Sequence, residues 1–204
     1  MIKMLKKMNV PNRLTMLRIA LVPVFIVLMV LVELHVWKYM NYVALAVFVA
    51  AAVTDALDGR ISRKNNLVTN FGKIMDPLAD KLLVASGLIM LSGLGTIPAW
   101  IVAVIICRDF FASSLRMFGS DNGVAIAAVK SGKIKTIFQM VGIAFAIIDS
   151  NTFGDFIVKG TTMGFVELAI NVFMTVSISL ALLATIWSLF DYLVKFGKHI
   201  DVEK

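Results

Sequence analysis

The chain has 204 residues, of which 59% are hydrophobic and 16% charged, whereas soluble domains are typically about 45–50% apolar and about 25% charged. Long apolar runs recur from one end to the other, which excludes a disordered, collagen-like or coiled-coil chain. The one cysteine, Cys107, cannot form an internal disulfide. The composition therefore predicts a membrane protein. Its formal net charge of +7 requires that the excess basic residues lie where water or anionic groups surround them.

Apolar segments long enough for membrane helices follow one another along the chain, because roughly 20 apolar residues span a bilayer as a helix. The expected segments are 14–34, 39–58, 71–91, 97–118, 134–148 and 163–192. The last is longer than one crossing needs, so we expect it to tilt or to extend into the headgroup region. The sequence thus predicts an all-α integral membrane protein with six transmembrane helices.

The N-terminal segment begins with lysines and then becomes apolar, as a signal peptide does. The apolar run is longer than a typical signal core and is not followed by a cleavage site of small residues, so we favour a short interfacial helix over residues 2–8. We expect a single membrane domain over residues 1–204. It consists of an interfacial segment (1–12), a six-helix bundle (13–195) and a cytoplasmic tail (196–204).

The positive charges indicate the orientation of these helices, because Lys and Arg collect on the cytoplasmic side of short loops. With the N-terminus inside, every lysine and arginine falls on the inner face except Lys38 and Lys159. Both termini are then cytoplasmic, and the inner face suits anionic headgroups or phosphate-bearing ligands. A role in topology alone would also explain any single one of these cations.

Four carboxylates occur within a short stretch beside apolar segments, where each is costly and suggests function. Asp55 and Asp58 are three residues apart and Asp76 and Asp80 are four apart, so each pair shares one face of a helix. Bare carboxylates in one pocket would repel, which favours divalent cations between them; oxygen ligands suit Mg²⁺, Mn²⁺ or Ca²⁺. The neighbouring glycines, Gly59 and Gly72, leave room for a ligand.

Two other readings of the aspartates remain open. They could be helix-end residues solvated at the interface, or the pathway of a cation or proton transporter. Their expected place at the cytoplasmic helix ends argues against a transporter, whose sites usually lie near the membrane midplane.

The aspartates also carry a resemblance to a known family. Residues 55–80 match the pattern D-x2-D-G-x2-A-R-x8-G-x3-D-x3-D in every spacing and at every fixed position but one, Ser62, which stands where the pattern has alanine. This stretch resembles the signature of the CDP-alcohol phosphotransferase family. Serine is also small, although its hydroxyl could alter nearby contacts.

Further runs resemble the members of that family that make phosphatidylglycerol phosphate. They are residues 10–18 (VPNRLTMLR), 76–81 (DPLADK) and 132–136 (GKIKT) with Gln139 after it. The DPLADK run is also similar to cardiolipin synthases of the same superfamily. The resemblance implies transfer of a phosphatidyl group from CDP-diacylglycerol to sn-glycerol 3-phosphate, with release of CMP; phosphatidylglycerol is the alternative acceptor.

The resemblance also implies roles for individual residues. Asp55, Asp58 and Asp76 would bind or bridge two divalent ions, expected to be Mg²⁺ with Mn²⁺ as an alternative, and Asp80 would complete the second site and be the candidate base. The donor would lie against six residues: Asn12, Thr15, Gly59, Arg63, Thr69 and Gly72.

The acceptor's phosphate needs a basic patch, because arginine and lysine bind phosphate with charge-assisted hydrogen bonds. The patch expected on the same membrane face consists of Arg108, Arg116, Lys133 and Lys135. The active site should open at the cytoplasmic leaflet of the inner membrane, where the donor's acyl chains stay in lipid. The resemblance suggests a homodimer, and no nucleic-acid partner is expected.

Overall fold

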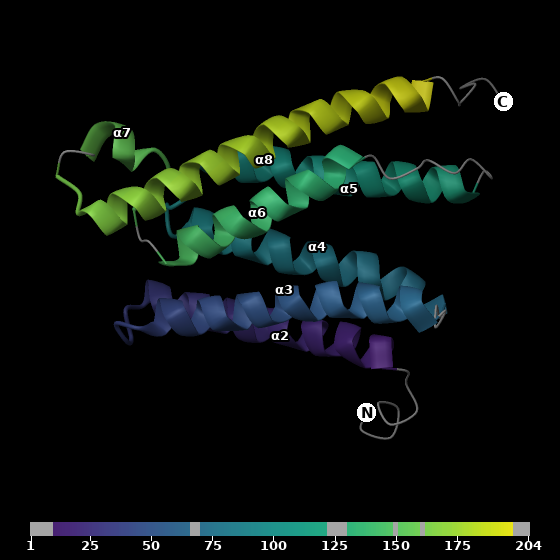
Figure 1. Cartoon of the computed structure of the whole chain (residues 1–204), viewed down its shortest axis with the longest axis horizontal. Coiled ribbons are helices and arrows are strands. Elements are labelled where there is room, and N and C mark those ends of the chain that lie inside the picture. The colour runs from purple at the N-terminus through teal and green to yellow at the C-terminus, as the bar shows by residue number, and fades with distance from the viewer. Residues whose placement is uncertain (1–9, 66–69, 122–129, 149–150, 160–161, 198–204) are drawn as a thin grey trace. The chain divides into compact units, whose positions relative to one another are not determined.

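Helices make up all the regular secondary structure in the part of the chain that the structure describes, residues 10–65, 70–121, 130–148, 151–159 and 162–197. The structure is a computed structural model, shown in Figure 1. Its contacts divide the chain into two units, Met1–Leu94 and Gly95–Lys204. Each unit is described by itself.

The first unit contains α2 (Val10–Glu33), α3 (Met40–Asn65) and α4 (Asn70–Gly93). Helix α2 packs against both α3 and α4. The rings of Phe25 and Phe48, both buried, lie 5.6 Å apart between centroids and join α2 to α3. Pro23 lies inside α2, a position tolerated in membrane helices because neighbouring groups satisfy the exposed carbonyl.

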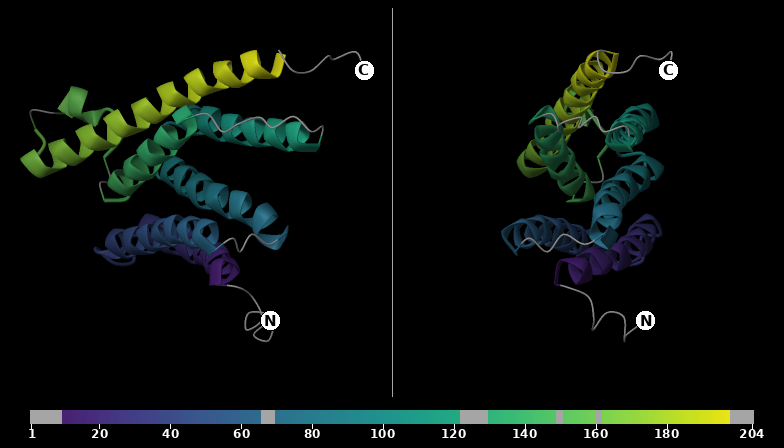
Figure 2. Two further views of the ribbon diagram at one scale, coloured as in Figure 1. Left: turned by 45° about the vertical axis from the view of Figure 1, so that its right-hand side comes forward. Right: turned by 90° about the vertical axis from the view of Figure 1, so that its right-hand side faces the viewer.

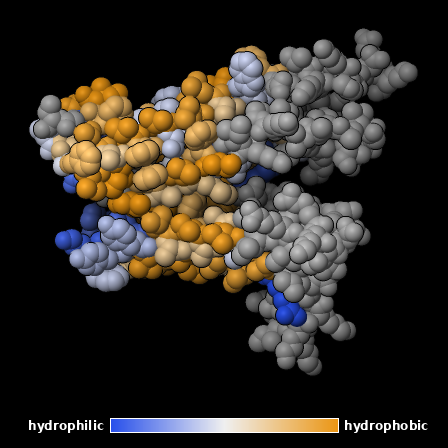
Figure 3. Space-filling view, viewed as in Figure 1, coloured by the Kyte–Doolittle hydropathy of each residue, from blue (hydrophilic) through white to orange (hydrophobic). Residues whose placement is uncertain are grey.

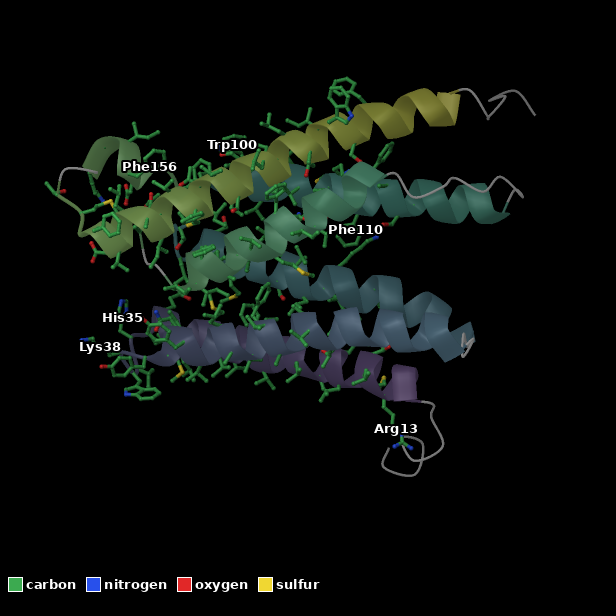
Figure 4. The ribbon with its side chains drawn as sticks, viewed as in Figure 1. Arg13, His35, Lys38, Trp100, Phe110 and Phe156 are labelled. Atoms are coloured by element: carbon green, nitrogen blue, oxygen red, sulfur yellow. The ribbon has the colours of Figure 1, made fainter. Side chains whose placement is uncertain are left out.

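A Schellman turn ends α2. The backbone N–H of Val36 donates to the carbonyl of Leu31 at 3.2 Å, and that of His35 to Val32 at 3.0 Å. His35 occupies the left-handed position, with φ 51°, where glycine is usual. The following residues Trp37 and Tyr39 are more than half exposed, as in the aromatic belts at membrane interfaces. Figure 4 shows His35 and Lys38 at one end of α2 and Arg13 at the other.

The second unit contains α5 (Ala99–Asp121), α6 (Lys130–Ile148), the short α7 (Asp155–Lys159) and α8 (Phe165–Gly197). Helix α8 packs along α6 and also contacts α5 and α7, and both views in Figure 2 place α6 beside α8. Pro98 precedes α5 and its carbonyl accepts from Ile101 at 3.0 Å. Because α5 begins directly after a proline, its start is fixed by the sequence.

Polar contacts attach the segment around α7 to α8. The buried side chain of Asn171 accepts from the backbone N–H of Phe156 and donates to the carbonyl of Thr152, at 3.0 and 3.1 Å. The backbone N–H of Thr152 donates to Asp155, and with the ammonium of Lys159 it lowers the pKa of that carboxyl. The segment is therefore held by hydrogen bonds, although its side chains are largely exposed.

Much of the described surface on the face seen in Figure 3 is apolar. On α8 the exposed large side chains recur every three or four residues: Phe173, Val176, Leu180, Leu183, Trp187 and Phe190. A soluble helix would carry polar residues on such a face. Among the described residues, Arg13–Glu33 and Phe165–Phe190 are long and apolar enough to cross a membrane, and three further apolar stretches are shorter.

The all-helical fold is confirmed for the described residues, and the six predicted segments each coincide with a long helix. Helix α3 continues to Asn65, seven residues past its expected end, because the prediction followed apolar residues and the helix goes on through a polar stretch. Helix α7 was not predicted. The expected interfacial helix over residues 2–8 lies outside the described residues. The number of membrane crossings and their orientation remain predictions.

Gly142 determines how closely α6 approaches α8. A Cβ atom at this position would lie 2.6 Å from Cδ1 of Ile178 and 3.3 Å from its backbone nitrogen. We therefore expect Gly142→Ala to lower the free energy of unfolding by about 1–3 kcal/mol, the usual cost of overpacking. Thermal unfolding in detergent measures the effect.

Two variants check this explanation. Gly93→Ala is the control, because a Cβ atom there meets nothing within 4 Å. Adding Ile178→Val to Gly142→Ala removes the Cδ1 contact, so the double variant should lose less stability than the sum of the single changes. Additive losses would mean that the close contact does not determine the packing of α6 on α8.

Candidate functional site

The four aspartates lie on two consecutive helices of the first unit. Asp55 and Asp58 are ten and seven residues before the end of α3, and Asp76 and Asp80 are six and ten residues after the start of α4. Only the segment 66–69 separates the two helices, which contact each other. With a rise of about 1.5 Å per residue, the two pairs stand at matching heights of about 10 and 15 Å from the connecting segment.

These four residues could hold divalent ions, because carboxylate oxygens are ligands that Mg²⁺ and Mn²⁺ prefer. The side chains of these four residues lie outside those that the structure describes. Among the described side chains, no group of three or more acidic, histidine or cysteine residues occurs.

The predicted donor residues are distributed over all three helices of the first unit. Asn12 and Thr15 lie on α2, Gly59 and Arg63 on α3 and Gly72 on α4, while Thr69 lies outside the described residues. Of these, only Thr15 has a described side chain, which is fully buried.

Arg18, one turn after Thr15 on α2, is also fully buried. Arg18 was not predicted as a site residue, although it belongs to the run that resembles the family. A buried guanidinium requires compensating negative charge nearby. The acidic residues of this unit are Glu33, which is exposed, and the four aspartates. Arg18 is a second buried polar residue of α2, beside Thr15.

Two of the four predicted acceptor residues come together in the second unit. Arg108 on α5 and Lys135 on α6 are both buried, with 7% and 2% of their side chains exposed. Both donate a hydrogen bond to the same oxygen, Oδ1 of Asp109. Nη1 of Arg108 lies 3.0 Å from that oxygen, and Nζ of Lys135 is its second donor. Arg116 and Lys133 lie on the same two helices, and their side chains are outside the described set.

Three residues of this cluster were missed by the sequence analysis. Asp109 pairs with both cations, and Ser188 on α8 accepts a hydrogen bond from Nη2 of Arg108. Gln139, one turn after Lys135, is 1% exposed, and its Nε2 has no hydrogen-bond partner among the described residues. The position of Gln139 four residues after Lys135 was the available signal, because that spacing puts both on one face of α6.

An apolar cavity of about 470 Å³ adjoins Arg108 in the second unit. Helix α5 lines it with Val104, Cys107, Arg108 and Phe111, and α8 with Thr185, Ile186 and Leu189. The guanidinium of Arg108 thus stands at a boundary, with the polar cluster of Asp109 and Lys135 on one side and apolar surface on the other.

Comparison with known proteins relates both groups of residues to one family. The family model described as CDP-alcohol phosphatidyltransferase matches residues 8–190, nearly the whole chain. This range contains the four aspartates and the cluster around Asp109.

Individual relatives carry a more specific description. The chain is 42% identical over 153 residues to a protein of Bacillus subtilis (strain 168), covering 71% of this chain and 79% of that one. It is 37% identical over 168 residues to a protein of Rickettsia typhi, covering 82% and 91%. It is 32% identical over 194 residues to a protein of Shigella flexneri serotype 5b, covering 91% and 93%. All three are described as CDP-diacylglycerol–glycerol-3-phosphate 3-phosphatidyltransferase.

The buried amide of Gln139 provides a test of the site's structure. A buried polar group without a partner costs about 1–3 kcal/mol. We therefore expect Gln139→Met, which keeps the length of the side chain, to raise the melting temperature in detergent.

Thr185→Val is the matched control, because the Thr185 hydroxyl is buried and donates to the carbonyl of Ala181 at 2.6 Å. That variant should lose stability. A fall in melting temperature for Gln139→Met as well would show that the amide contributes to folding in the absence of ligand.

Proposed function

The chain belongs to the CDP-alcohol phosphatidyltransferase family, and from this membership we propose that it transfers the phosphatidyl group of CDP-diacylglycerol to the hydroxyl of sn-glycerol 3-phosphate. The products are phosphatidylglycerol phosphate and CMP. The observation that carries the proposal is the shared description of relatives that are 32–42% identical over most of this chain. The enzyme is thus a transferase of phospholipid synthesis.

Asp55, Asp58, Asp76 and Asp80 would hold two divalent ions, with Mg²⁺ preferred. When bound, such ions neutralise charge on the pyrophosphate and stabilise the attacking and leaving oxygens. Asp80, which shares a face of α4 with Asp76, is the candidate base for the acceptor's hydroxyl, as the resemblance to the family implies.

The donor's nucleotide and pyrophosphate would bind to α2, α3 and α4. Gly59 and Gly72 leave space beside the aspartates, and Arg63 offers a bidentate donor to phosphate. Asn12, Thr15 and Thr69 would complete the nucleotide contacts. The fully buried Arg18 adds positive charge to the same unit.

The acceptor's phosphate would bind to the basic residues of the second unit, Arg108, Arg116, Lys133 and Lys135. Support comes from Arg108 and Lys135, which are buried and share one carboxylate. The amide of Gln139, with Nε2 buried and unpartnered among the described residues, is a further donor for that phosphate.

We place the enzyme in the inner membrane with six crossings, both termini in the cytoplasm and the active site at the cytoplasmic leaflet. Arg13 and Lys38 lie at opposite ends of α2, and the aspartates lie on the halves of α3 and α4 nearest the connecting segment, where the end of α3 carries Arg60, Arg63 and Lys64. Both observations agree with the excess of positive charge on the inner side. A homodimer is the expected assembly.

Release of CMP tests this function directly. The purified protein, with Mg²⁺ and CDP-diacylglycerol, is offered glycerol 3-phosphate, serine, inositol phosphate or phosphatidylglycerol in parallel. We expect release with glycerol 3-phosphate. Release with phosphatidylglycerol alone would reassign the acceptor within the family, whereas cation flux in vesicles without any CMP would favour a transporter.

The metal assignment predicts the effect of removing single carboxylates. Asp→Asn at Asp55, Asp58, Asp76 or Asp80 should each lower turnover by about 100-fold or more, because each removes one ligand charge from a shared site. Chelation with EDTA should abolish turnover, and Mg²⁺ should restore it.

Asp155→Asn is the control, because this carboxylate belongs to the first residue of α7 and is distant in sequence from the four aspartates. It should keep wild-type turnover. Wild-type rates in both Asp55→Asn and Asp76→Asn would exclude the two-metal assignment, since these are the proposed shared ligands.

The acceptor assignment makes a separate prediction for Lys135. A charge-assisted hydrogen bond to phosphate is worth about 1.5–3 kcal/mol, so Lys135→Gln should raise the KM for glycerol 3-phosphate by about tenfold or more. The KM for CDP-diacylglycerol should change less. Lys159→Gln, at an exposed lysine, is the control, and an unchanged KM in Lys135→Gln would limit Lys135 to a structural role.

A further inference from the structure

The ion cluster of the second unit contains a carboxylate that the acceptor site would not be expected to need. Arg108 and Asp109 are adjacent on α5, and adjacent helical side chains diverge by about 100°. Nevertheless the guanidinium of Arg108 bonds to the Asp109 carboxylate at 3.0 Å, on the oxygen that also accepts from Lys135 of α6. One oxygen therefore fixes cations from two helices.

A second hydrogen bond holds the guanidinium of Arg108. Its Nη2 donates to the hydroxyl of Ser188 on α8, which is fully buried. The two terminal nitrogens of the guanidinium thus bond to residues on different helices, α5 and α8. Because both ends are held, the plane of the guanidinium has a defined orientation within the second unit.

The three charged side chains of the cluster differ in how much of each is exposed. Asp109 is 23% exposed, more than Arg108 at 7% and Lys135 at 2%. Asp109 is therefore the most accessible of the three side chains. The three side chains carry a net charge of +1, so a dianionic phosphate is attracted even while the carboxylate stays in place.

We propose that Asp109 and Ser188 are positioning residues of the acceptor site. They hold Arg108 and Lys135 together before the acceptor arrives, and the phosphate oxygens then accept part of the hydrogen bonding now directed to Asp109. Without the carboxylate, two buried cations would repel and turn apart. The advantage is preorganisation, since the cations need not be ordered when the acceptor binds. This inference rests on the proposed function.

Steady-state kinetics with both substrates test the inference. Asp109→Asn keeps the size of the side chain and removes its charge, and it should raise the KM for glycerol 3-phosphate about tenfold, the effect of losing one charge-assisted contact. The KM for CDP-diacylglycerol should stay within about twofold, because the donor's expected residues are distant in sequence. Asp109→Glu, which restores the charge, should recover most of the affinity.

Ser188→Ala is an independent variant, useful if Asp109→Asn does not fold. It removes one neutral partner of Arg108, so we expect a KM increase of about threefold for glycerol 3-phosphate alone. Protection against thermal unfolding by glycerol 3-phosphate, measured in EDTA without donor, should weaken in both variants. Glycerol, which lacks the phosphate, is the control ligand and should protect neither the variants nor the wild type.

Several outcomes would overturn the inference. A lower KM for glycerol 3-phosphate in Asp109→Asn would mean that the carboxylate only repels the acceptor. An unchanged KM in either folded variant, or equal increases for both substrates, would mean that the contacts are structural. Absence of CMP release by the wild-type protein with glycerol 3-phosphate would instead refute the proposed function, so the two failures are distinguishable.

Discussion

Buried charge is the constraint on which the arrangement of this protein depends. Its helices present apolar faces outward, and an ionised side chain among them needs a partner of opposite charge or a ligand. In the second unit Asp109 meets this need for Arg108 and Lys135. Since Ser188 also bonds to Arg108, the same few contacts connect α5, α6 and α8. The contacts of these two cations therefore add to the close packing of α6 on α8 at Gly142.

The first unit carries its four aspartates on two consecutive helices. Four aspartates stand at matching heights on α3 and α4, and the buried Arg18 supplies one positive charge. Repulsion among four carboxylates brought into one pocket would raise the cost of folding. Under the proposed function, divalent ions would reduce this repulsion in addition to supplying the chemistry of pyrophosphate cleavage.

Much of this organisation could be predicted from the sequence, because apolar runs and motif spacing are local signals. The six long helices and the pairing of the aspartates by helical period needed no tertiary information. The predicted end of α3 was wrong, because this helix continues beyond its apolar residues. The turn at His35 was not predicted, since a left-handed histidine has no distinctive sequence signal. Asp109 was missed because its role depends on Lys135 approaching from another helix.

The charge of the acceptor distinguishes the two family activities that the motifs leave open. Glycerol 3-phosphate is a small soluble dianion, whereas phosphatidylglycerol carries a single negative charge within a lipid. Arg108, Lys135 and Asp109 together carry +1, and the amide of Gln139 adds a neutral donor one turn away. The attraction to this net positive charge is proportional to the charge of the ligand, so a dianion gains about twice as much as a monoanion. The net positive charge of the three side chains, rather than Asp109 alone, therefore agrees with a phosphate monoester as the proposed acceptor.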